Sequence, residues 1–101
     1  MAVTVVRYRT KPERADENQA LIEGVFAELA STKPDGLQYT SVRLDDGVSF
    51  VHVAIVETAD GTNPLTAVTA FKEFTRDIAD RCAEPPVATP GTVVGSYEGA
   101  R

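Results

Sequence analysis

The sequence predicts an α+β fold with a four-stranded antiparallel sheet and two helices on one face of it. Three observations carry this prediction: helix-start signals at Pro12 and at Asn63-Pro64, a turn dipeptide at Asp46-Gly47, and apolar periodicities that switch between two and about 3.6 residues. They divide residues 1–101 into strand, helix, strand, strand, helix and strand. No linker or repeat interrupts this order, so a single domain is expected.

The first third of the chain predicts a strand and then a helix. Residues 3–9 are rich in β-branched and aromatic side chains, which favour a strand. Pro12 suits the first turn of a helix, and acidic residues follow it, where the positive end of the helix dipole stabilises them. Residues 34–36, Pro-Asp-Gly, end this helix. Its apolar positions form one stripe: Leu21, Ile22, Val25, Phe26 and Leu29.

Residues 37–44 and 48–57 predict a β-hairpin. Asp46-Gly47 between them favours a type I′ turn, in which both central residues have positive φ. A two-residue loop at this dipeptide fixes which residues lie opposite one another on the two strands. The resulting pairs include Tyr39 with Ala54, Ser41 with His52, and Arg43 with Phe50.

The last third predicts a second helix and a final strand. Asn63 and Pro64 supply an N-cap and a first helical residue, and apolar residues then recur at helical spacing to about residue 81. The prolines at 85, 86 and 90 predict irregular structure, and residues 92–97 predict a strand near a sheet edge. The complete order is that of the ferredoxin-like βαββαβ fold.

Both faces of the predicted hairpin are largely apolar. One face carries Val42, Leu44, Val51, Val53 and Ile55. The other carries Leu37, Tyr39, Phe50, Ala54 and Val56, interrupted by Ser41, Arg43 and His52. Two helices cover only one face of a sheet, so the sequence predicts a homodimer that packs through the open sheet face.

The charge and composition disfavour several classes of partner. Ten basic and 15 acidic residues give a net charge of −5, which opposes binding to nucleic acid or to anionic membrane surfaces. The longest apolar run, residues 53–56, is far shorter than the roughly 20 residues that span a bilayer. The lone Cys82 cannot form an internal disulfide, which fits a cytoplasmic protein. We expect neither a metal nor a cofactor, because metal-ligand spacings and phosphate-binding glycine loops are missing from the sequence.

An RNA-recognition module has the same topology and is disfavoured by particular residues. Residues 46–53 match the third-strand signature of that module at three positions. The leading basic residue of the signature is replaced by Asp46, and two of its stacking rings are replaced by Val48 and Val53. An acidic chain without these rings is poorly suited to RNA.

Three segments resemble the antibiotic biosynthesis monooxygenase family, which belongs to the dimeric α+β barrel proteins. They are residues 34–39 (Pro-Asp-Gly-Leu-Gln-Tyr), residues 50–57 (Phe-Val-His-Val-Ala-Ile-Val-Glu) and residues 71–74 (Phe-Lys-Glu-Phe). The resemblance covers nearly the whole chain and implies a dimeric α+β barrel. Ala70 stands where the family often has histidine, and the chain has no tryptophan, so haem degradation is not expected.

The resemblance implies two functions. One is oxygenation of an aromatic or quinol-type substrate without a cofactor, in which the substrate carbanion reduces oxygen and the protein supplies a dry cavity and a proton acceptor. The alternative is non-catalytic ligand binding or interaction by the same fold.

His52 is the predicted catalytic residue, because an imidazole exchanges protons near neutral pH. It lies in mid-strand among apolar residues, and a compact polar cluster on an apolar face is typical of a small-molecule pocket. The alternative is a structural histidine satisfied by Ser41 or Tyr39, or one at the dimer interface. The predicted ligand-binding residues, for a small apolar or aromatic molecule, are Tyr39, Ser41, Arg43, Phe50 and Phe71.

Overall fold

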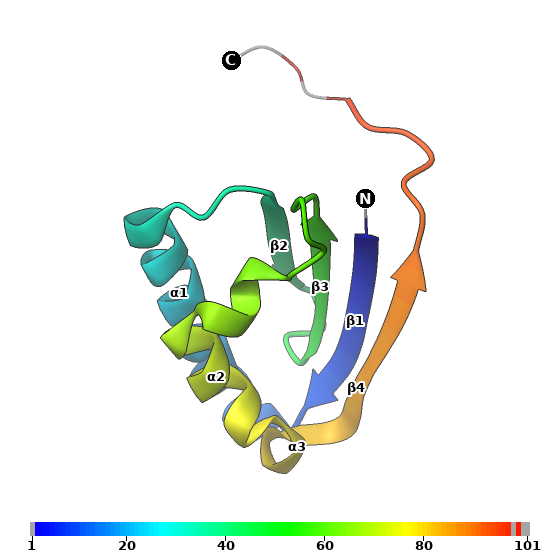
Figure 1. Ribbon diagram of the computed structural model, residues 1–101. Coiled ribbons are helices and arrows are strands. Elements are labelled where there is room, and N and C mark those ends of the chain that lie inside the picture. Colours follow the sequence, from blue (N-terminus) through cyan, green and yellow to red (C-terminus); the bar gives the residue numbers. More distant parts are fainter. Residues whose placement is uncertain (1, 98, 100–101) are drawn as a thin grey trace.

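The computed structural model describes residues 2–97 and 99, and its strands form one four-stranded antiparallel sheet in the order β2-β3-β1-β4. The centre consists of β1 (Ala2–Thr10) and β3 (Ser49–Val56), and the edges are β2 (Leu37–Arg43) and β4 (Cys82–Gly91). The helices all lie against one face of this sheet (Figure 1). The predicted α+β, ferredoxin-like fold is confirmed.

The first helical segment begins with a short 3-10 turn, η1 (Pro12–Arg14), and continues as α1 (Ala15–Thr32). Pro12 occupies the first turn, as its fixed φ favours. The helix ends at Lys33, which has a left-handed conformation and donates its backbone N–H to the Leu29 carbonyl. Ile22 and Val25 of the predicted apolar stripe are buried, and its other members pack against the core.

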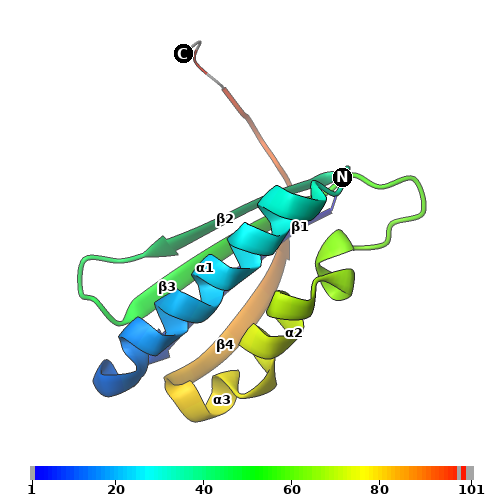
Figure 2. The ribbon, with the colours of Figure 1, turned by 90° about the vertical axis from the view of Figure 1, so that its left-hand side faces the viewer.

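The second helical segment is broken into three pieces rather than continuous. These are η2 (Pro64–Ala67), α2 (Thr69–Arg76) and α3 (Ile78–Arg81). Asn63 is the predicted N-cap, and its side chain accepts a hydrogen bond from the Leu65 backbone N–H at 3.0 Å. The first break comes at Val68, whose extended backbone allows its side chain to be buried in the core. α1 and α2 run side by side across the sheet (Figure 2).

The hairpin has the predicted register but a different turn. Strand pairing places Tyr39 opposite Ala54 and Ser41 opposite His52. Gly47 has a φ of +79°, whereas Asp46 does not adopt positive φ, so the turn is not type I′. The Leu44 N–H instead bonds the Ser49 carbonyl around a four-residue loop, which is commonly built on a type I turn. The Asp46 carboxylate accepts hydrogen bonds from the backbone N–H groups of Val48 and Ser49, so these donors of the loop have an acceptor.

The last strand lies earlier in the chain than predicted. β4 contains all three prolines that were expected to prevent regular structure, and residues 92–97 form no strand (Figure 1). An edge strand has a partner on one side only, so a residue without an N–H is tolerated there. Pro85 and Pro86 lie where the pairing with β1 shifts register, between the partners of Arg9 and Arg7. The prediction was wrong because an edge strand tolerates these prolines.

Strand alternation separates a covered face of the sheet from an open one. On β3, Phe50, His52, Ala54 and Val56 are buried beneath the helices, while the residues between them are half-buried. The core therefore lies between sheet and helices, on the face that carries His52. None of the helices in the described residues has the length and apolarity needed to cross a membrane.

Glu28 of α1 joins the two helices. Its two carboxylate oxygens accept hydrogen bonds from the backbone N–H groups of Thr69 and Ala70, both at 2.9 Å. Backbone N–H groups in the first turn of a helix have no acceptor within the helix, and the N-cap residue of α2 supplies no capping side chain. A carboxylate there also lies at the positive end of the helix dipole. Glu28 thus fixes where α2 begins relative to α1.

We expect Glu28→Ala to lower the free energy of unfolding by about 1 kcal/mol, because two helix N–H groups lose their acceptor. Urea denaturation followed by circular dichroism measures this change. Glu23→Ala is the matched control, since Glu23 is an exposed acid on the same helix whose side chain bonds only Gln19 among the described residues. Equal stability of the two variants would contradict the capping role.

Candidate functional site

His52 lies at the centre of the covered sheet face. It belongs to β3, and its neighbours in the sheet are Ser41 on β2 and Val6 on β1. Only 4% of its surface is exposed. The period-two alternation of β3 turns this side chain toward the helices together with Phe50 and Ala54.

Both ring nitrogens of His52 have hydrogen-bond partners. Nε2 lies 2.8 Å from the Tyr8 hydroxyl, and Nδ1 lies 2.7 Å from the Tyr39 hydroxyl and 2.8 Å from Ser41 Oγ. Tyr8 and Tyr39 also stack on the imidazole, with ring centroids at 5.4 and 5.8 Å. Buried polar groups require such partners, so the cluster satisfies an imidazole that water does not reach.

The polar contacts continue from Tyr8 into the helical layer. Asn18 of α1, fully buried, donates from Nδ2 to the Tyr8 hydroxyl at 2.9 Å. Arg81 of α3, 1% exposed, donates from Nε to Asn18 Oδ1 at 3.1 Å and from Nη2 to the Phe74 carbonyl. Its guanidinium also lies over the Phe74 ring. A connected chain of hydrogen bonds thus links a buried cation to the imidazole.

A cavity of about 240 Å³ opens between the sheet and the second helical segment. Five of its lining side chains carry rings: Tyr8, Tyr39, His52, Phe71 and Phe74. Aliphatic side chains, with Asn63 and two threonines, complete the lining. A dry cavity of about 150 Å³ accommodates benzene, so this volume suits a ligand of two or three fused rings. An apolar wall with a few convergent polar groups is typical of a small-molecule site.

The structure brings together only part of the predicted ligand-binding set. Tyr39, His52 and Phe71 line the cavity. Ser41 contacts His52 but faces a separate shallow depression that also includes Arg43 and Phe50. Phe50 is buried and stacks on Tyr8. Ser41 is therefore connected to the cavity only by its contact with the imidazole. Ligand roles for Ser41, Arg43 and Phe50 stay predictions, which the positions of Arg43 and Phe50 do not favour.

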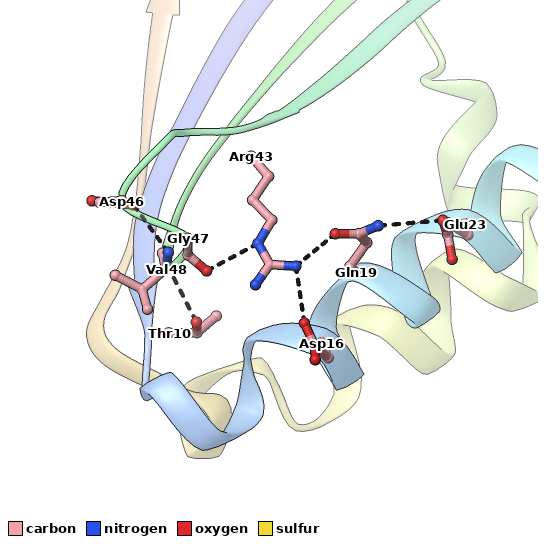
Figure 3. Close-up of polar contacts among 8 residues, drawn as sticks. All are labelled: Thr10, Asp16, Gln19, Glu23, Arg43, Asp46, Gly47 and Val48. Carbon is pink, nitrogen blue, oxygen red and sulfur yellow. Dashed lines mark hydrogen bonds and ion pairs between the residues drawn. The ribbon is translucent and has the colours of Figure 1, made fainter.

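Arg43 is engaged in holding the hairpin to α1. Its guanidinium donates to the Gly47 carbonyl at 2.9 Å, to Gln19 Oε1 at 2.7 Å and to Asp16 Oδ1 at 3.1 Å (Figure 3). The side chain thus bridges the turn and the first half of the helix. These bonds occupy the N–H groups of Nε and Nη1, so the side chain is committed to this bridge.

Burial changes the acid–base properties of the cluster. It lowers the pKa of His52 to about 4, so the imidazole is neutral near pH 7. Burial also raises the pKa of Tyr8, and the hydrogen bond from Asn18 opposes that rise. It raises the pKa of Tyr39 as well, and a hydrogen bond from Ser41 opposes it. The site therefore holds neutral phenols around a neutral imidazole at physiological pH.

Three residues of the network were not predicted from the sequence: Tyr8, Asn18 and Arg81. Tyr8 follows Thr4 and Val6 at strand spacing, so a strict alternation on β1 would have indicated it. Asn18 lies four residues before Ile22 and seven before Val25, on the apolar stripe of α1. A polar residue on such a stripe is a signal of a buried hydrogen bond. No comparable signal in the sequence indicates Arg81.

Comparisons with known proteins confirm the fold. No family model and no curated protein matches the sequence. A candidate antibiotic biosynthesis monooxygenase from Nitrosomonas europaea superposes with a TM-score of 0.76 at 16% identity, over 94% of this chain and 100% of that one. One from Bacteroides thetaiotaomicron gives 0.76 at 16%, over 99% and 95%. A mutant of SnoaB, a cofactor-independent oxygenase from Streptomyces nogalater, gives 0.69 at 16%, over 97% of each chain. The resemblance noted in the sequence is therefore confirmed at the level of fold.

We expect acidification to destabilise the protein through His52. The unfolded chain binds a proton at this imidazole below its ordinary pKa of 6.5, whereas the folded protein binds it only near pH 4. Stability is therefore lost as pH falls from 6.5 to 4, by about 3 kcal/mol, and no further loss comes from this group below that range. Urea unfolding of the wild type between pH 4 and 8 measures the change.

His52→Gln is the comparison, because His52 is the only histidine and the carboxyl groups are common to both proteins. The difference between the two stability curves isolates the imidazole. A direct NMR titration of the His52 ring gives the same pKa without a variant. A ring pKa near 6.5 would contradict the expected destabilisation.

Proposed function

We propose that the protein binds a small aromatic molecule in the cavity between sheet and helices and oxygenates it without a cofactor. The observation that carries this proposal is the ring-lined cavity, whose polar groups converge at the Tyr39–His52 pair. The shared fold supports it, since one protein with that fold is described as a cofactor-independent oxygenase.

The proposed reaction needs only substrate and oxygen. An electron-rich aromatic methylene compound such as an anthrone loses a proton, and the resulting carbanion transfers electrons to O₂. A carbon–oxygen bond forms, and the proton taken first returns to give a hydroperoxide. The second hydrogen on the same carbon then leaves as a proton while the O–O bond breaks, so one oxygen atom leaves as water and the other becomes a ketone oxygen. The protein excludes bulk water, orients the ring against its aromatic lining and stabilises the anion.

His52 is the proposed proton acceptor. It is neutral near pH 7, so a lone pair is available on the ring. Both nitrogens are covered by hydroxyl groups, so the substrate exchanges its proton with His52 through Tyr8 or Tyr39, which also line the cavity. The negative charge of the ionised substrate would stabilise the buried imidazolium while it lasts.

One observation favours the alternative, binding without turnover. The low pKa of His52 makes it a weak base, and its full set of hydrogen-bond partners is what a structural histidine requires. In this second candidate function, the cavity selects an aromatic ligand by shape and by hydrogen bonding at Tyr39. The two functions share a site and differ in chemistry.

We also propose a homodimer that packs through the open sheet face. Valine and isoleucine side chains populate that face, and two of them, Val42 and Val87, are 45% and 62% exposed. Val53 and Ile55 lie on the same face near the sheet centre. Burying such residues against a second copy would contribute roughly 1.5 to 3 kcal/mol for each one fully covered.

We expect the wild type to convert anthrone and hydroquinone substrates faster than the uncatalysed reaction, measured as oxygen uptake and ketone or quinone formation. His52→Gln is expected to lower kcat about 100-fold, the contribution typical of a positioned acid or base. Glu23→Ala, on the solvent side of α1, serves as the control and keeps full activity. Saturable binding without turnover by the wild type would establish the alternative function instead.

We expect Val53→Glu to convert a dimer to a monomer, because it places a charge at the centre of the proposed interface. Light scattering coupled to gel filtration at micromolar concentration measures the mass of each protein. Ala27→Glu adds the same charge to an exposed position on α1 and leaves the dimer intact. A monomeric wild type would overturn the proposed assembly without affecting the cavity.

A further inference from the structure

We propose that Arg81 and Asn18 fix His52 in the tautomer that carries its hydrogen on Nδ1, and that this makes the Tyr39 hydroxyl a hydrogen-bond donor toward the cavity. The preferred ligand then presents an acceptor oxygen at Tyr39, as a ketone, phenolate or enolate does. The inference rests on the proposed function in one respect, because it assigns the chemistry of the molecule bound in that cavity.

Arg81 determines the orientation of the Asn18 amide, because a guanidinium donates hydrogen bonds and never accepts them. Its Nε lies 3.1 Å from the Asn18 side chain, and that contact requires the Asn18 oxygen. The amide nitrogen of Asn18 consequently faces Tyr8, at 2.9 Å from its hydroxyl. The orientation of Asn18 is thus determined by a neighbour that has only one possible role.

Tyr8 lies between Asn18 and His52, so the orientation of Asn18 determines which nitrogen of His52 carries the hydrogen. Its oxygen accepts the Asn18 N–H, so its own hydrogen needs an acceptor inside a site that is only 4% exposed. His52 Nε2, at 2.8 Å, meets that need. Nε2 therefore carries no hydrogen, and a neutral imidazole places its single N–H on Nδ1.

The Nδ1–H group points to the Tyr39 and Ser41 oxygens, at 2.7 and 2.8 Å. The Tyr39 oxygen accepts this hydrogen bond. With this donor directed at its oxygen, Tyr39 keeps its own hydrogen for the cavity that it lines. Incoming donors also polarise the hydroxyl and strengthen it as a donor.

Two roles follow for residues that never touch the ligand. Asn18 and Arg81 are positioning residues, because they determine the donor at Tyr39 from the far side of the imidazole. The lone pair of His52 lies on Nε2, so a proton accepted there arrives through the Tyr8 hydroxyl. Tyr39 holds the oxygen of the ligand while Tyr8 conducts the proton.

Asn18→Asp tests this chain of hydrogen bonds with almost no change in shape. The carboxylate pairs with Arg81 and can only accept from Tyr8, so Tyr8 must give its hydrogen to residue 18 and accept one from His52. The tautomer is then expected to change to Nε2–H. Nitrogen-15 NMR of the ring reads this directly at pH 7 in the unliganded proteins, and the single histidine removes any ambiguity of assignment.

We expect an Nδ1–H ring in the wild type and an Nε2–H ring in Asn18→Asp. A wild-type ring with hydrogen on Nε2, or an unchanged tautomer in a folded Asn18→Asp, would overturn the inference. Asn18→Leu, which removes both hydrogen bonds, provides a second measurement and is expected to give a mixture of tautomers. A single Nδ1–H tautomer in that variant would show that Asn18 is not required.

Ligand binding tests the donor at Tyr39 separately. The probes are α-tetralone, which has a ketone oxygen, and tetralin, which has the same ring system without it. Tyr39→Phe and Asn18→Asp are each expected to weaken tetralone binding about five- to tenfold and to leave tetralin binding unchanged. Equal losses for both probes would contradict the donor role. Failure of both probes to bind the wild type would count against the proposed function, whereas the tautomer decides the hydrogen-bond inference in either case.

Discussion

Burying an imidazole between a sheet and two helices imposes a condition that much of this protein satisfies. An unpartnered ring nitrogen in such a place costs roughly 1 to 3 kcal/mol, so each nitrogen of His52 needs a hydroxyl beside it. Tyr8 and Ser41 come from the two strands that flank β3, and the hairpin register brings Ser41 directly opposite. The strand register therefore places the hydroxyl groups beside the imidazole, and the hydrogen bonds they make stabilise that register.

The two ends of the covered sheet face differ in the kind of side chain that joins the sheet to the helices. Near Arg43 the sheet is joined to α1 by hydrogen bonds from the guanidinium to Asp16 and Gln19 (Figure 3). Beneath α2 the contacts are made by rings, which leave a space because their shapes do not fill it. One end is held by polar bonds to α1, and the other contains the ring-lined cavity. The Glu28 cap, which positions α2, helps to set the size of that space.

The sequence contained most of the fold and about half of the site. Alternation and turn residues predicted the hairpin register correctly. This register is strongly specified, since a shift by one residue would move His52 and the buried side chains of β3 to the open face. The type of turn was wrong, since backbone bonds to Asp46 replace positive φ at that residue. The last strand was placed about ten residues too late because the prolines were expected to prevent regular structure, although an edge strand tolerates them. The contact of Arg81 with Asn18 joins residues 63 positions apart, so only tertiary packing reveals it.

The proline-rich edge also restricts how copies of this protein can associate. A regular edge strand offers a row of free N–H and C=O groups to any passing strand, and sheets that extend in this way grow into aggregates. β4 contains three residues without an N–H and a local shift in pairing, and both make its backbone irregular. Intermolecular strand addition is therefore obstructed on this side of the sheet, and only the proline-free edge at β2 keeps a regular row of backbone groups among the described strands.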